Sequence, residues 1–298
     1  MARSYTRDDE PVPGFRLTAF LGRGGFGEVW KATAPGGTEA AIKIINLSGK
    51  QGLKEFRAIR LVKKIRHPNL VPLYAFWLKD DQGKMLEDSA AEQAEISTRA
   101  PAGPSRGTMA IRSDSSGVPK PAELIIAMGL GEKNLLDRME ECQRLGMAGI
   151  PVDELLNYME DSAKAIDFLN SPRHDMGLGP AAIQHCDIKP QNIMIVGGAA
   201  QVCDFGLARV LGGDIRTSLA AVSPAYGAPE FLKNNQPSQT TDQYSLAISY
   251  IELRTGQLPF DCDSSPAVMM AHINGTLNLS HLVEPERQVI QRATMLDP

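Results

Sequence analysis

The apolar residues in the first part of the chain fall into short runs that are typical of β-strands. Residues 15–21 form an apolar-rich run that ends in a cluster of glycines, and residues 28–33 have a similar strand-like composition. A further run, at 40–45, follows the turn-like sequence Pro35-Gly-Gly. These runs predict that the chain begins with a β-rich region.

The spacing becomes helical over 52–65, where apolar residues recur every three or four positions. Pro68 ends this pattern, because a proline disfavours helical geometry in the residue before it. Residues 80–121 are rich in Ala, Ser, Gly, Pro and charge, and such a composition buries too little apolar surface to offset the entropy of ordering. We expect a mobile insertion there, inside one domain, because the run at 123–127 resumes the strand pattern.

After about residue 131 the pattern is mainly helical. Residues 152–169 and 241–253 carry apolar side chains at helical spacing. Two short strand-like runs, at 193–196 and 201–203, are joined by the turn Gly197-Gly198. The predicted fold class is therefore α+β, with a strand-rich part followed by a helix-rich part.

Composition narrows the function classes. Hydrophobic residues make up 43% and charged residues 22%, as in soluble globular proteins, and the net charge of −4 gives no reason to expect a nucleic-acid partner. The four cysteines lack a C-x-x-C pair, so we expect free thiols and neither a disulfide framework nor a zinc site. No run approaches the ~20 apolar residues of a membrane helix, and the first residues lack a secretory signal. We therefore expect a cytoplasmic chain without a membrane segment.

A glycine-rich turn is the first candidate site. In Gly22-x-Gly24-x-x-Gly27 the backbone can approach phosphate groups closely, because glycine has no side chain. Taken alone, such a match is more often an ordinary turn. Here it follows a strand-like run, and Lys43 lies on a later predicted strand, where its ammonium could reach the same phosphates. A dinucleotide-binding loop would be followed by a helix, whereas residues 28–33 are strand-like.

The second cluster is His185-Cys-Asp187-Ile-Lys189-Pro-Gln-Asn192. A carboxylate that orients an attacking hydroxyl, with a nearby amide that can hold a metal, suits phosphoryl transfer, which depends on positioning and charge stabilisation. Lys189 can neutralise the transferred group, whereas His185 has no evident proton-transfer duty and is interpreted as structural. Asp204, in Asp204-Phe-Gly, is a candidate magnesium ligand, since magnesium favours carboxylate and phosphate oxygens.

These motifs, followed by Ala228-Pro-Glu230, occur in the order found in the eukaryotic-like protein kinase family, which the sequence resembles from about Gly14 to its last residue. The match is closest to the Ser/Thr kinases of bacteria. The resemblance implies a bilobal kinase fold, with a 1–13 tail, a small β-rich N-lobe at about 14–128 and a larger helical C-lobe at about 131–298. It also implies a Mg-ATP-dependent enzyme that transfers the γ-phosphate to a protein Ser or Thr hydroxyl.

By this resemblance, the three glycines cover the ATP phosphates and Lys43 holds the α and β phosphates. Asp187 orients the substrate hydroxyl, and Asn192 and Asp204 bind two magnesium ions that bridge the phosphates. The adenine ring would be contacted by Val29, Ala41 and Met194 and by a hinge from Met128 to Leu130, with Ala127 as a small gatekeeper. Ordinary core packing would bury the same apolar residues.

The resemblance assigns structural duties as well. Lys189 two residues after Asp187 is the arrangement of Ser/Thr kinases, and Ser223 is expected to lie near both. Asp242 is expected to brace the backbone of the catalytic loop. A stacked apolar spine would consist of Val62, Leu73, His185 and Phe205.

Three positions depart from the family pattern. Ala58 stands where a glutamate normally pairs with Lys43. Glu55 lies one turn earlier, about 4.5 Å along a helix; it could take over this pairing, or it could be a solvated charge while Lys43 pairs with Asp204.

Cys186 replaces an arginine that usually pairs with a phosphorylated residue, so we expect activity to depend little on phosphorylation of Thr217 or Ser218. The arginine that normally pairs with Glu230 is missing, which favours a domain truncated at its C-terminal end.

Two other function classes compete with this interpretation. A pseudokinase, which binds ATP or acts as a scaffold without transfer, would explain the missing glutamate and arginine. Retention of Lys43, Asp187, Asn192 and Asp204 favours an active enzyme. A small-molecule phosphotransferase is less consistent, because such enzymes generally lack the Ala-Pro-Glu segment and this glycine loop. The sequence does not specify the substrate protein, the activating signal or the oligomeric state.

Overall fold

The computed structural model describes residues 4–24, 27–47, 65–86, 121–175, 180–205, 208–210, 223–262 and 264–296. The chain divides into two compact units. The N-terminal unit comprises Met1–Leu53 and Leu73–Gly129, and the C-terminal unit comprises Lys54–Pro72 and Leu130–Pro298. The first is built on a β-sheet and the second is mainly helical, so the predicted α+β class is confirmed.

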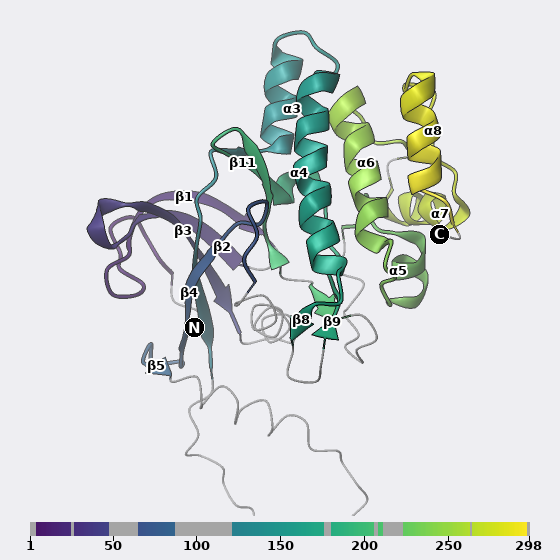
Figure 1. Cartoon of the computed structure of the whole chain (residues 1–298). Coiled ribbons are helices and arrows are strands. Elements are labelled where there is room, and N and C mark those ends of the chain that lie inside the picture. Colours follow the sequence, from purple (N-terminus) through teal and green to yellow (C-terminus); the bar gives the residue numbers. More distant parts are fainter. Residues whose placement is uncertain are drawn as a thin grey trace, which may run out of the picture. The chain divides into compact units, whose positions relative to one another are not determined.

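The N-terminal unit contains one antiparallel sheet of six strands in the order β1-β2-β3-β6-β4-β5 (Figure 1). The strands are β1 (Arg16–Gly24), β2 (Gly27–Thr33), β3 (Glu39–Asn46), β4 (Leu73–Lys79), β5 (Met85–Leu86) and β6 (Glu123–Met128). A short 3-10 turn, η1 (Pro35–Gly37), connects β2 to β3. Strand β3 is buried from Ala40 to Ile45 because it is paired on both edges and carries β-branched isoleucines.

The strands expected at 15–21, 28–33, 40–45 and 123–127 are all present. Strand β4 was not anticipated from the sequence. The first residues of the expected insertion, 80–86, form a turn and β5, which pairs with the end of β4. The rest of that insertion, 87–120, and the helix expected at 52–65, except for Ile65, lie outside the described residues.

The segment before Gly14, expected as a tail, packs against this sheet. Tyr5 and Val12 are buried in the core of the N-terminal unit together with Leu17 and Trp30. The Tyr5 hydroxyl donates to Glu123 Oε2 at 2.6 Å, and the buried Lys79 ammonium donates to the Pro11 carbonyl. Tyr5 and Val12 therefore contribute to the core.

In the C-terminal unit four helices lie side by side: α3 (Leu135–Arg144), α4 (Val152–Asn170), α6 (Thr241–Thr255) and α8 (Glu284–Ala293) (Figure 1). Helix α6 is buried along most of its length, which explains its weak amphipathic pattern. Helix α5 (Pro229–Asn234) contacts α7 (Ser265–Asn274). Within the described ranges, no helix has the length and apolarity that a membrane span requires.

Short strands of the C-terminal unit position the predicted catalytic loop. A three-stranded sheet has the order β12-β11-β7, formed by β7 (Lys133–Asn134), β11 (Ile193–Val196) and β12 (Ala199–Val202). The remaining pairs are β8 (His174–Asp175) with β9 (Pro180–Ala181) and β10 (Ile183–Gln184) with β13 (Arg209–Val210). The 3-10 turn η2 (Pro190–Asn192) follows the loop and leads into β11.

Candidate active site

The glycines of the N-terminal unit lie where β1 turns into β2. Gly22 pairs with Val29 and Gly24 with Gly27. Gly27 has φ +126°, and a Cβ there would lie 2.1 Å from the backbone oxygen of Ile44, so only glycine fits. A Cβ at Gly22 or Gly24 would meet no atom of the described chain within 4 Å. Gly22 and Gly24 leave the open backbone that a phosphate ligand needs, and at position 27 the close approach to β3 in addition requires a glycine.

Lys43 lies in the middle of β3 and is only 5% exposed. Its neighbours across the sheet are Val29 on β2 and Ile126 on β6. Lys43 also takes part in a further interaction within the structure. Glu55, the replacement partner considered for Lys43, lies outside the described residues, as does Ala58, the position that lacks the usual glutamate. Whether Lys43 pairs with Glu55 or with Asp204 therefore stays open.

The predicted adenine contacts divide between the two units. In the N-terminal unit, Ala41 pairs with Lys31 and with Met128, the last residue of β6. In the C-terminal unit Leu130 precedes Gly131, whose missing side chain leaves room for Met194: a Cβ there would lie 2.6 Å from the Met194 methyl carbon. Val29, Met128, Leu130 and Met194 are partly exposed and Ala41 is buried. Their role in nucleotide binding stays a prediction.

A compact hydrogen-bonded cluster surrounds Asp187. The Asp187 side chain is only 3% exposed. Its Oδ2 accepts a hydrogen bond from Lys189 Nζ at 2.9 Å and another from the Asn192 side-chain amide at 2.9 Å. Oδ1 accepts from the Ser223 hydroxyl at 3.1 Å, and Lys189 Nζ also donates to Ser223 at 2.8 Å. The contacts expected of Ser223 with Asp187 and Lys189 are thus confirmed. The bonds fix both oxygens of the carboxylate.

The backbone of the same loop is held by a buried carboxylate, as expected. The amides of His185 and Cys186 donate to Asp242 at 2.7 and 2.8 Å. Cys186 has φ +64°, a left-handed conformation that is costly for a residue with a Cβ, so the two bonds stabilise an otherwise unfavourable turn. Burial raises the pKa of Asp242, and the bonds from His185 and Cys186 oppose this shift.

His185 has the structural role predicted for it. It is fully buried; Nε2 lies 2.9 Å from the Cys203 carbonyl, and Nδ1 accepts from the Asp187 amide at 3.3 Å. Its ring lies 5.2 Å from that of Phe205, which confirms this contact of the expected spine. Val62 lies outside the described residues, and the contact with Leu73 stays a prediction.

Asn192 and Asp204, the expected metal ligands, are joined through the backbone, because the amide of Cys203 donates to the Asn192 carbonyl at 2.9 Å. The Asn192 amide group donates to Asp187, which leaves its side-chain oxygen available as an acceptor. Asp204 is partly exposed and has φ +65°. Among the described residues no cluster of three or more His, Cys, Asp or Glu side chains forms a metal site by itself.

The segment that follows Ser223 is tied to α6. The Tyr226 hydroxyl donates to Glu252 at 2.6 Å. Glu230 accepts from the Ser238 hydroxyl at 2.8 Å and from the Thr241 hydroxyl at 2.6 Å. Hydroxyl groups therefore satisfy one oxygen of this carboxylate.

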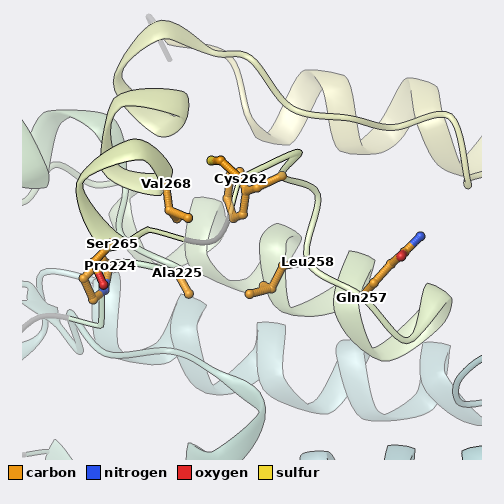
Figure 2. A pocket seen from close by; sticks show the side chains of 8 residues that line it. Pro224, Ala225, Gln257, Leu258, Cys262, Ser265 and Val268 are labelled. Atoms are coloured by element: carbon orange, nitrogen blue, oxygen red, sulfur yellow. The ribbon is translucent and has the colours of Figure 1, made fainter.

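A pocket of about 440 Å³ opens beside this segment (Figure 2). Pro224 and Ala225, the two residues after Ser223, form one wall, and Val268 of α7 lies on another side. None of the described residues that line it is charged: they are Pro224, Ala225, Gln257, Leu258, Phe260, Cys262, Ser265 and Val268. Phe260, one of the lining residues, packs edge-on against the buried His272, with ring centroids 4.7 Å apart.

Sequence reasoning missed the pocket and one buried cation of the C-terminal unit. Arg209 on β13 is 5% exposed and donates to Asn235 at the end of α5. Arg209 belongs to no recognisable sequence motif, and the pocket is formed by segments that are distant in the sequence. The sequence therefore contains no signal for Arg209 or for the residues that line the pocket.

Comparison with known proteins agrees with this geometry. A family model described as the protein kinase domain matches residues 113–295, more than half of the 298 residues. The LRR receptor-like serine/threonine-protein kinase EFR of Arabidopsis thaliana is 30% identical over 271 residues, which cover 87% of this chain and 22% of that protein.

Two further relatives come from the same plant. The L-type lectin-domain containing receptor kinase V.5 is 28% identical over 249 residues, covering 82% of this chain and 30% of that protein. The serine/threonine-protein kinase BRI1-like 2 is 27% identical over 259 residues, covering 85% and 18%. The chain thus spans less than a third of the length of these relatives, and the expected likeness to bacterial kinases stays a prediction.

Each of these alignments is longer than the family-model match, so each also includes part of the chain before residue 113. They extend the likeness into the part of the chain that precedes residue 113. The match to the family model and the named relatives lead to one conclusion: the chain belongs to the protein kinase family, among its eukaryotic-like Ser/Thr members.

Proposed function

We propose that this chain is a Mg-ATP-dependent Ser/Thr protein kinase that transfers the γ-phosphate of ATP to a protein hydroxyl. Membership of the family implies ATP as substrate, a divalent metal ion and protein substrates. The observation that carries the proposal is the cluster in which Lys189, Asn192 and Ser223 all bond to Asp187.

The cluster supports a role for Asp187 in orienting the acceptor. Its carboxylate is almost fully buried and is held by donors on both oxygens, so it loses little orientational freedom when a substrate hydroxyl donates to it. Lys189 brings a cation to the same place, where it can offset the negative charge of the transferred phosphoryl group. The link from Lys189 to Ser223 matches the arrangement expected of Ser/Thr kinases.

The residues present fit a magnesium ion that binds together with its nucleotide. Asn192 and Asp204 supply an amide oxygen and a carboxylate, the donor types that magnesium accepts. Magnesium commonly uses one or two protein carboxylates together with substrate phosphates, which agrees with the lack of a larger cluster among the described residues. The metal would neutralise phosphate charge, while Gly22, Gly24, Gly27 and Lys43 would hold the phosphates and Val29, Ala41, Met128, Leu130 and Met194 the adenine.

The pocket beside Pro224 supports a protein as the acceptor. Consecutive Cα atoms are about 3.8 Å apart, so Pro224 and Ala225 lie close to Ser223 and hence to Asp187. A peptide whose hydroxyl reaches Asp187 would pass this pocket, and the uncharged lining of its described residues favours an uncharged side chain. The cytoplasmic location expected from the sequence belongs to the same proposal, as does the two-lobed domain with boundaries near 128–131.

The decisive experiment is an assay of phosphate transfer to a generic protein substrate with magnesium and labelled ATP, followed by mapping of the modified residues. We expect incorporation into Ser and Thr that Asp187→Ala abolishes. Asp167→Ala, an exposed aspartate on α4, is the matched control and should retain activity. Binding of ATP without incorporation would instead support the pseudokinase alternative.

A further inference from the structure

His272 on α7 is a buried polar residue next to the pocket beside Pro224. It is fully buried, and Val268, one turn earlier on the same helix, lines the pocket together with Pro224 and Ala225 (Figure 2). The imidazole ring packs edge-on against Phe260, a further lining residue. A titratable ring therefore occupies the core directly beside the pocket lining.

Tyr244 of α6 determines which nitrogen of this ring carries the hydrogen. Nδ1 of His272 lies 2.8 Å from the Tyr244 hydroxyl. Burial raises the pKa of Tyr244, so the hydroxyl keeps its proton and can donate it to Nδ1. Burial also lowers the pKa of His272 to about 4, so the ring is neutral at neutral pH. A neutral ring whose Nδ1 accepts a hydrogen bond carries its own hydrogen on Nε2.

Nε2 faces the backbone of the pocket wall. The backbone groups of Ala225 and Pro224 oppose the decrease in the pKa of His272, which is the effect of carbonyl oxygens, since proline has no backbone N–H. Because Tyr244 occupies Nδ1, the nitrogen that faces these carbonyls is Nε2. An Nε2 without a hydrogen would repel the two oxygens, so the pocket wall and Tyr244 favour the same form of the ring.

The hydrogen bond between Nε2 and the pocket wall is incomplete. Nε2 of His272 is buried, and no acceptor in the described part of the chain meets hydrogen-bond geometry around it. A buried donor without an acceptor costs free energy, because it has lost water without gaining a partner. A small movement of residues 224–225 toward α7 would complete this bond, and a peptide in the pocket would contact these same residues.

We propose that His272 is a positioning residue for substrate selection: its Nε2 hydrogen bonds to the backbone of residues 224–225 when a protein substrate fills the pocket, and this bond fixes the pocket wall. The described lining carries no charge, so a wall held in this way selects an apolar side chain of the substrate. Ser223, directly before the wall, bonds to Asp187, so the wall also affects how the substrate hydroxyl is presented. The role of His272 rests on the proposed kinase function and adds to it a residue that sets the choice among protein substrates.

The test measures kcat/KM for two synthetic serine peptides that differ only in the residue directly after the serine, which is leucine or aspartate. This position is chosen because the wall directly follows Ser223, which contacts Asp187. The ratio of the two kcat/KM values is independent of the fraction of protein that is folded, so it reports selection and not stability. We expect the wild type to prefer the leucine peptide by roughly tenfold or more, because the aspartate would be buried without a partner.

Three variants separate the two nitrogens of the ring. His272→Gln places an N–H close to the position of Nε2 and should keep the preference within about twofold of the wild type. His272→Asn has a polar group only near the position of Nδ1, and His272→Leu has none. Both should lower the preference to about threefold or less and raise KM for the leucine peptide about fivefold, with KM for ATP unchanged. His281→Leu, at an exposed histidine, is the matched control and should behave as the wild type.

Three results would overturn the proposal. One is a wild type that does not distinguish the two peptides. Another is a His272→Leu protein with the preference of the wild type. The third is a His272→Gln protein as impaired as His272→Leu, because the loss would then not depend on the N–H at the Nε2 position.

Hydrogen exchange at the amides of residues 225–227 tests the same bond without reference to activity. The leucine peptide should slow exchange there about fivefold in the wild type and in His272→Gln, but not in His272→Leu. Normal transfer with equal slowing in His272→Leu and the wild type would refute the role of His272 and leave the kinase function supported. Absence of transfer by the wild type, with slowing that His272→Leu abolishes, would instead refute the kinase function and leave the contact of His272 with the wall supported.

Discussion

Asp242→Asn is the substitution whose effect follows most directly from the structure. The carboxylate is fully buried and accepts the amides of His185 and Cys186, one on each oxygen. Asparagine has one oxygen and one amide nitrogen, so one of the two backbone amides would face a donor instead of an acceptor. A hydrogen bond to a charged group is worth about 1.5–3 kcal/mol, and an unsatisfied buried amide costs about 1–3 kcal/mol.

Relief of the buried charge offsets part of this loss, since burial raises the pKa of Asp242. We expect a net decrease in the free energy of unfolding of about 3 kcal/mol, measured by urea denaturation at pH 7. Because Cys186 keeps its left-handed turn through these bonds, the loop should relax and kcat should fall roughly tenfold or more. Asp167→Asn, on the exposed face of α4, should change neither quantity.

The pH dependence supplies a second readout of the same substitution. A raised pKa means that the folded protein binds a proton at Asp242 more readily than the unfolded chain does. Its contribution to stability is therefore present at low pH and is lost as the pH rises through the raised pKa. Asp242→Asn should remove this loss and flatten the stability profile above the ordinary pKa of aspartate. Neutral surface substitutions change the free energy of unfolding by at most about 0.5 kcal/mol. A change no larger than this in Asp242→Asn, together with a normal kcat, would show that the two bonds to Asp242 are unimportant.

Three further predictions use matched pairs of variants. Gly27→Ala should lower the free energy of unfolding by about 2 kcal/mol, because its Cβ would lie 2.1 Å from the Ile44 oxygen. Gly24→Ala is the control, since its Cβ would meet no described atom within 4 Å, and it should keep the stability of the wild type. Thermal melts compare the two variants, and equal melting temperatures would contradict the prediction. Burial lowers the pKa of His272 to about 4, so the free energy of unfolding should fall by about 3 kcal/mol as the pH falls from 6.5 to 4. Urea titrations at several pH values should show a weaker pH dependence of this free energy for His272→Gln and an unchanged one for the exposed His281→Gln. Val268→Trp fills the pocket and should raise KM for the protein substrate about fivefold, a loss of ~1 kcal/mol of binding free energy, without changing KM for ATP. Met270→Trp, on the exposed side of α7, should leave both KM values unchanged. A higher KM for the protein substrate in Met270→Trp but not in Val268→Trp would exclude the pocket from substrate binding.

Strands β2 and β3 were predictable because their apolar residues occur in short runs between turn residues. Strand β4 was not, because Lys79 is buried at its end and its run lacks a clear boundary. Helix α8 also escaped notice: only Ile290 is buried there, and its charged residues mask the apolar positions.

The catalytic cluster was predictable to the extent that local motifs encode it. Asp187, Lys189 and Asn192 occur within six consecutive residues, so their proximity follows from one turn. Ser223 and Asp242 come from distant segments, and only the family resemblance placed them there. The partnership of Arg209 with Asn235 depends on how β13 approaches α5, which no local pattern specifies.

The packing of Tyr5 and Val12 determines how fragments of this protein should be prepared for experiments. A fragment that starts at Gly14, where the family resemblance begins, would uncover the aromatic surface of Trp30 and deprive the Lys79 ammonium of the Pro11 carbonyl. Such a fragment would tend to aggregate through the exposed apolar surface. Affinity tags and fusion partners are therefore better joined ahead of Tyr5, with every residue from there onward retained.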